Sequence, residues 1–88
     1  PELRIPCPDA RKAAVVGEVG ERLAAEGANV DRADGLRVET ADGWWLLRAS
    51  GTEPKLTCRA EAADAGGLAR LRTEMKRQLA LSGVPLDA

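Results

Sequence analysis

Five consecutive positions, Arg48 to Thr52, bring together a guanidinium, two hydroxyl groups and a glycine. Arg48 offers a planar fork of N–H donors, and the hydroxyl groups of Ser50 and Thr52 donate hydrogen bonds from other directions. Gly51 has no Cβ, so neighbouring backbone N–H groups are able to come close to a ligand. This combination of donors suits an oxyanion.

The flanking residues predict that this set lies in a short loop between two strands. The apolar run Trp44–Leu47 precedes it, and an alternating apolar and polar segment, 55–62, follows it. Pro54 fixes the backbone where the loop ends, which reduces the entropy lost when a ligand orders the loop. The alternative is an ordinary surface loop, because Ser, Gly, Thr and Pro are common turn residues and many surface arginines are simply solvated.

Segment 48–55 has the sequence RASGTEPK. It resembles the phosphate-binding loop in the C-terminal domain of the α-D-phosphohexomutases, which include phosphomannomutases, phosphoglucomutases and phosphoglucosamine mutases. The resemblance extends from Asp34-Gly35 through Trp44 to Glu61-Ala62, and an Arg-x-Ser-Gly-Thr-Glu-Pro run between two strands is a fairly specific signature. It implies that residues 1–88 form the C-terminal phosphate-binding domain of a longer enzyme.

The resemblance also assigns roles within the loop. The residues expected to contact the substrate phosphate are Arg48, Ser50, Gly51 and Thr52. Glu53 repels phosphate while it is ionised, so its expected role is to accept hydrogen bonds from loop amides and stiffen the turn. Pro54 and Lys55 complete the support of the loop, with Lys55 adding positive potential without direct contact. No residue of this chain is expected to be catalytic or to bind a metal ion.

As the resemblance implies, the full enzyme interconverts hexose 1-phosphate and hexose 6-phosphate through a phosphoserine in its first domain. Mg2+ is then held by an Asp-rich loop of another domain, the partners are the phosphosugar substrate and the other domains, and the location is cytoplasmic. The chain contains neither the phosphoserine motif nor the Asp-rich loop, so by itself it is expected to be inactive. The identity of the hexose stays open, with phosphoglucosamine mutase as the alternative.

Composition excludes several other functions. An 88-residue chain with 13 basic and 14 acidic residues makes one small domain without the basic excess that attracts nucleic acid or anionic membranes. Two Trp and no Phe or Tyr leave few platforms for stacking bases, and no apolar run approaches the roughly 20 residues of a membrane span. A free-standing protein-interaction module fits the size equally well, but it leaves the composition of the loop unexplained.

The apolar patterning predicts the elements that position the loop. The expected order is a strand over 3–7, a helix beginning at an Asp9 N-cap and ending at Gly27, a short strand and turn over 28–35, strands over 36–40 and 44–47, a strand over 55–62, and a helix from an Asp64 N-cap to Gly83. Asp42-Gly43 predicts a type I′ hairpin turn. Cys7 and Cys58, far apart in strand-like settings, are interpreted as small buried thiols.

These elements predict an α+β fold in which an antiparallel sheet of four to five strands is covered on one face by two helices. The apolar strand 44–47 is expected to be central in the sheet. The order of the elements agrees with the resemblance, which implies a domain related in fold to half of the TATA-binding protein.

Overall fold

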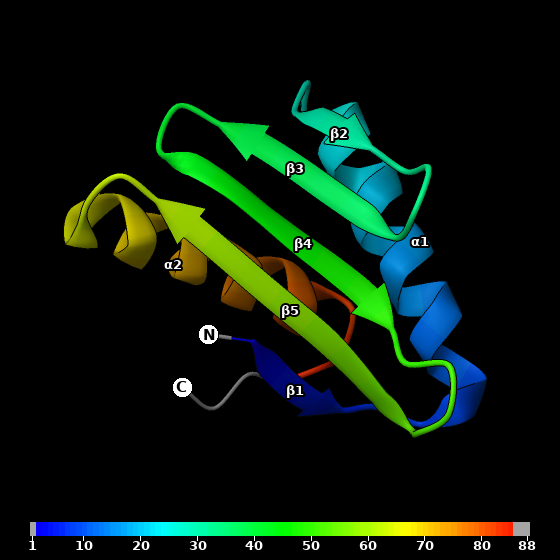
Figure 1. Ribbon diagram of the computed structural model, residues 1–88. Coiled ribbons are helices and arrows are strands. Elements are labelled where there is room, and N and C mark those ends of the chain that lie inside the picture. The colour runs from blue at the N-terminus through cyan, green and yellow to red at the C-terminus, as the bar shows by residue number, and fades with distance from the viewer. Residues whose placement is uncertain (1, 86–88) are drawn as a thin grey trace.

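The computed structural model describes residues 2–85 and contains, within them, five strands and two helices in the predicted order (Figure 1). The strands are β1 (Leu3–Pro6), β2 (Asn29–Asp31), β3 (Leu36–Thr40), β4 (Gly43–Ala49) and β5 (Lys55–Ala62), and the helices are α1 (Asp9–Ala25) and α2 (Ala65–Leu81).

The strands form a single antiparallel sheet in the order β1-β5-β4-β3-β2. Strands β2 to β5 follow one another as a meander, so β4 lies at the centre, as predicted for the apolar run that it contains. β1 pairs with β5 at the outer edge, where the missing N–H of Pro6 costs no ladder hydrogen bond to a further strand. Both helices lie behind the same face of the sheet (Figure 1), which confirms the predicted α+β fold.

Alternation along each strand sends one set of side chains into the layer between sheet and helices. Trp45 and Leu47 of β4 are fully buried there, whereas Trp44 and Leu46, which lie on the opposite face, are only half-buried. The guanidinium of Arg37 lies 4.4 Å from the centroid of the Trp44 ring. The buried core consists of Ile5, Cys7, Val15, Val19, Leu23, Leu36, Val38, Trp45, Leu47, Leu56, Cys58, Leu71, Met75, Leu79 and Val84. The two cysteines are free and buried, as predicted.

The start of α1 differs from the prediction that Asp9 is its N-cap. Pro8 occupies that position with φ −56° and ψ 140°, and its carbonyl accepts from the N–H groups of Arg11 and Lys12. Asp9 is the first helical residue, and its carboxylate lies 2.9 Å from the ammonium of Lys12 instead of capping the backbone. Pro8 has the extended ψ of an N-cap residue, and its carbonyl accepts the first helical hydrogen bonds, so its missing N–H costs the helix nothing. It therefore takes the N-cap position that was predicted for Asp9.

The hairpin between β3 and β4 is also not the predicted type I′ turn. Its loop residues are Ala41 and Asp42, and no described non-glycine residue has positive φ, which a type I′ turn requires at both central positions. Gly43, with φ 148°, instead begins β4. A Cβ at Gly43 would overlap the carbonyl oxygen of Glu61, so glycine is needed here for the close approach of β5. Arg70 holds the Asp42 carboxylate by a hydrogen bond and lowers its pKa.

Asp64 caps α2 as predicted, because its carboxylate accepts a hydrogen bond of 2.7 Å from the N–H of Gly67. We expect Asp64→Ala to lower the free energy of unfolding by about 1 kcal/mol, since an N–H in the first turn loses its acceptor. Urea unfolding followed by circular dichroism measures this change. Asp64→Asn keeps an acceptor and should unfold near the wild-type midpoint, so equal losses in the two variants would contradict a capping role.

Candidate functional site: the loop between β4 and β5

Residues 50–54 connect β4 to β5 at one end of the sheet (Figure 1). The N–H of Ser50 donates to the carbonyl of Lys55 at 3.0 Å and closes the loop. Arg48 lies opposite Thr57 on β5, one residue before β4 ends at Ala49. Its side chain points to the side of the sheet away from the core and is 51% exposed. The predicted arginine is therefore available to a ligand.

Within the loop, the Ser50 hydroxyl oxygen organises the backbone. It accepts from the N–H of Thr52 at 3.4 Å and from the N–H of Glu53 at 3.2 Å. The hydroxyl proton of Ser50 is not used in these two bonds and remains able to donate. Apart from its chain neighbours, no residue comes within 4 Å of where a Cβ of Gly51 would be, so the tip of the loop opens to solvent.

The turn before β3 supports Arg48. Asp34 places a carboxylate oxygen 3.6 Å from the guanidinium, and this carboxylate side chain is 85% exposed. Gly35, with φ 74°, lies so close to the arginine that a Cβ there would come 2.8 Å from Arg48 Cγ. The aliphatic part of Arg48 is thus held by backbone contact, while its exposed ion pair with Asp34 is of the weak kind that another anion is able to replace.

The exit of the loop is tied to the beginning of α1. The carbonyl of Glu53 accepts from the Lys12 ammonium at 2.9 Å and from the Lys55 N–H at 2.8 Å. The carbonyl of Pro54 accepts from the N–H of Cys7 at 2.9 Å. The Glu53 carboxylate lies 3.6 Å from the Lys55 ammonium.

This arrangement corrects the role expected for Glu53. Its side chain does not accept from the loop amides, because the shorter Ser50 side chain reaches them from within the turn. Glu53 supports the loop through its backbone carbonyl and through its contact with Lys55. Lys12 was not predicted as a site residue, since it looks like an ordinary polar residue of an amphipathic helix. Its only sequence signal is its position three residues after Asp9, with which it forms an ion pair.

A hollow of about 290 Å³ opens beside the loop, at the end of the sheet. Ala13 and Val16 of α1 form one wall of it. Its other lining residues are Asp34, Gly35, Arg48 and Ala49. The structure therefore combines an exposed guanidinium, two loop hydroxyl groups and an adjoining concave surface, which together are able to hold a small anion.

A family model described as "Phosphoglucomutase/phosphomannomutase, C-terminal domain" matches residues 2–78. This chain belongs to that family. The match confirms the family resemblance carried by segment 48–55 and covers all elements from β1 into α2.

The relatives of this domain include proteins named phosphomannomutase/phosphoglucomutase, phosphoglucomutase and phosphoglucosamine mutase. A phosphomannomutase/phosphoglucomutase of Pseudomonas aeruginosa is 39% identical over 80 residues, which cover 90% of this chain and 17% of that protein. A probable phosphoglucosamine mutase of Methanopyrus kandleri is 41% identical over 70 residues, which cover 80% of this chain and 16% of that protein. The chain thus spans about one sixth of the length of these curated relatives.

The fold of this C-terminal domain also has a solved counterpart. A phosphoglucomutase/phosphomannomutase family protein of Burkholderia thailandensis superposes with a TM-score of 0.78 and 31% sequence identity. The superposition covers 98% of this chain and 19% of the other. The arrangement of strands and helices around the loop is therefore that of the family.

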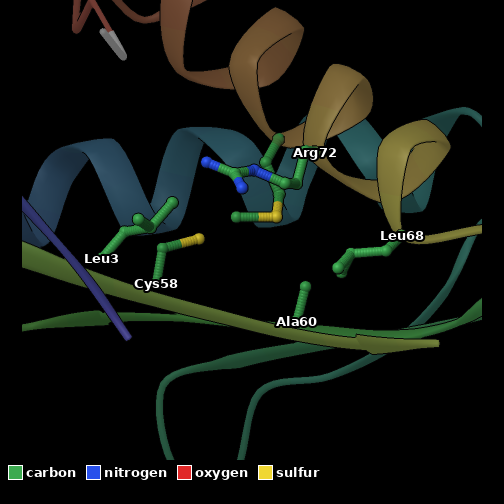
Figure 2. Close-up of a pocket in the computed structure, with 6 residues that line it drawn as sticks. Leu3, Cys58, Ala60, Leu68 and Arg72 are labelled. Atoms are coloured by element: carbon green, nitrogen blue, oxygen red, sulfur yellow. The ribbon is translucent and has the colours of Figure 1, made fainter. Parts of the chain in front are cut away.

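A second hollow in this domain lies between α2 and strands β1 and β5 (Figure 2). Its volume is only about 70 Å³. It is lined by Leu3, Cys58, Ala60, Leu68, Arg72 and Met75. Burial raises the pKa of the Cys58 thiol to about 12, so this thiol is protonated and unreactive at neutral pH. Five of the six lining side chains are apolar or a protonated thiol, so this hollow lacks the donor set of the loop.

Two further observations concern the described part of this domain. Residues 2–85 contain no group of three or more His, Cys, Asp or Glu side chains that could hold a metal ion. None of the described helices is long and apolar enough to cross a membrane.

Proposed function

We propose that this chain binds the phosphate group that is not being transferred during a phosphohexomutase reaction. The observation that carries the proposal is the exposed guanidinium of Arg48 at the base of a loop whose hydroxyl groups and open tip lie at the same end of the sheet. In this function Arg48 supplies charge-assisted hydrogen bonds, and Ser50 and Thr52 supply hydroxyl donors. Backbone N–H groups at Gly51 and its neighbour complete the donor set.

Binding one phosphate of the substrate serves the reaction at the other end of the sugar. The anchored phosphate fixes the distance and direction of the hydroxyl that receives or releases the second phosphoryl group. Positioning of this kind accounts for several kcal/mol of an activation barrier, roughly 7–11 kcal/mol in the best-oriented reactions. The domain then contributes to catalysis without a catalytic residue of its own.

The full-length protein in this proposal interconverts hexose 1-phosphate and hexose 6-phosphate in the cytoplasm, as a phosphomannomutase/phosphoglucomutase. The relatives named phosphoglucosamine mutase make an amino sugar phosphate the alternative substrate. Phosphoryl transfer and Mg2+ binding belong to other domains of that protein. Those domains and the phosphosugar are the partners of this domain. Nucleic acid and membranes are not partners in this proposal. The described residues offer no carboxylate cluster that fits Mg2+, and the isolated chain is expected to be inactive.

A titration of this chain with glucose 1-phosphate, followed by amide NMR, tests the proposal. We expect shifts concentrated in residues 48–55, with a millimolar dissociation constant because the other domains are absent. Unphosphorylated glucose at the same concentrations is the control and should leave these signals in place. Equal shifts with both sugars, or no shifts in the loop up to high millimolar concentration, would contradict a phosphate site in this chain.

The competing function, a protein-interaction module, has one observation in its favour. Trp44 and Leu46 are half-buried on the sheet face that the helices leave open. That face does not explain the donor set of the loop. If the titration with glucose 1-phosphate shows no shifts in the loop, the interaction module stands equal to the phosphate-binding function.

A further inference from the structure

Lys12 is a largely buried lysine that reaches from α1 to the loop. Its side chain is only 16% exposed, and its ammonium contacts the Asp9 carboxylate at 2.9 Å. It also donates to the backbone carbonyl of Glu53 at 2.9 Å, across 41 positions of sequence. The covered aliphatic stem of Lys12 and the two partners of its ammonium together restrict the conformation of the side chain.

The hydrogen bond from Lys12 reaches the loop where it leads into β5. Glu53 directly follows Thr52, the last residue proposed to contact phosphate. Its carbonyl also accepts from the N–H of Lys55, and the next carbonyl, of Pro54, accepts from Cys7. The exit of the loop is thus fastened to the segment that contains β1 and the start of α1.

The tip of the loop is held much less firmly. It is held by two bonds of 3.4 and 3.2 Å to the Ser50 hydroxyl oxygen, and the space around Gly51 is open. The amide and hydroxyl donors of the tip therefore depend on the fixed exit for their position. Sites that bind charge tightly need such support, since a ligand otherwise has to order the loop as it binds.

We propose that Lys12 is a positioning residue of the phosphate loop, an inference that rests on the function proposed above. Lys12 acts on the loop through the Glu53 carbonyl rather than by touching phosphate. Its ion pair with Asp9 offsets its charge and orients the ammonium toward that carbonyl. An isolated surface ion pair with Asp9 would contribute little to stability. The hydrogen bond to the Glu53 carbonyl is what connects Lys12 to the loop.

The test replaces Lys12 and measures the affinity of this chain for glucose 1-phosphate by amide NMR. We expect Lys12→Met to weaken binding about five- to tenfold, because a hydrogen bond from a charged donor that orders the site is lost. Lys76→Met is the matched control. Lys76 is exposed on α2, so its replacement removes the same charge and should change affinity less than twofold. Lys12→Arg keeps a charged donor and should retain most of the affinity.

A readout without ligand separates this inference from the proposed function. Lys12→Met should shift the amide signals of residues 50–55 while those of the core strands stay in place, and Lys76→Met should shift neither set. Lys12→Gln replaces Lys12→Met in every comparison if the methionine variant does not fold. Unchanged loop signals, or shifts spread equally over the core, overturn the positioning role even if wild-type chain binds phosphate. Failure of the wild type to bind, with loop-specific shifts in the variant, overturns the proposed function alone.

Discussion

Arg48→Ala is expected to weaken binding of glucose 1-phosphate about ten- to hundredfold. A hydrogen bond to a charged group contributes roughly 1.5–3 kcal/mol, and phosphate would lose the one guanidinium proposed to contact it. The side chain is 51% exposed and lies outside the core, so its removal should leave the fold intact. Arg48→Lys should recover only part of the affinity, because an ammonium lacks the planar fork of donors.

The measurement is the same amide NMR titration, with Arg32→Ala as the matched control. Arg32 is also exposed and lies 3.8 Å from a carboxylate of Glu21, so its loss removes an equal charge from a weak ion pair that includes neither Arg48 nor a residue of the loop. If both variants bind equally well, the interaction is a general effect of charge and Arg48 is not a phosphate ligand. In a full-length protein, Arg48→Ala should lower kcat/KM for the sugar phosphate at least tenfold.

Most of the fold was predictable because its signals are local. The strict alternation of Leu36 and Val38 with polar residues marks a strand that is covered on one face, and both side chains are buried as that pattern requires. The N-cap at Asp64 was predictable for the same reason, since the capping bond spans three residues.

The two errors in the predicted elements have different causes. Asp9 is a favourable N-cap residue, but Pro8 takes the boundary position and Asp9 pairs with Lys12. Asp-Gly favours a type I′ turn, but Gly43 is needed in β4 to let the backbone of β5 approach. The approach of β5 to Gly43 is visible only once the strands are assembled, whereas Pro8 and Lys12 are local competitors for the role of Asp9.

The candidate site divides in the same way. The donor set of Arg48, Ser50 and Thr52 is contiguous in sequence, so its chemistry was predictable. Its supporting residues were not, because Lys12 and Asp34 are distant in sequence and come close to the loop only in the folded chain.

Gln78, in the core, was also not predicted as a buried residue. It is fully buried, and its side-chain oxygen accepts a hydrogen bond of 2.8 Å from Arg22 across the two helices.

Trp45→Ala is expected to be the most destabilising of the substitutions considered, at about 3–5 kcal/mol. Trp45 is fully buried at the centre of the sheet, where its removal leaves a large cavity under both helices. A domain of this size typically has about 4–13 kcal/mol of stability in total, so Trp45→Ala should remove a large part of it. Because Arg48 lies three residues further along β4, unfolding would also remove the phosphate site.

Trp44→Ala is the matched control for this prediction, since the two tryptophans are adjacent and face opposite sides of the sheet. Trp44 is half-buried, and its loss removes an exposed contact with the Arg37 guanidinium worth about 0.5–1 kcal/mol. Urea unfolding followed by circular dichroism should therefore show a small shift of the midpoint for Trp44→Ala and a large one for Trp45→Ala. Similar losses for both variants would contradict this prediction. They would mean that the open face of the sheet contributes as much to stability as the face covered by the helices.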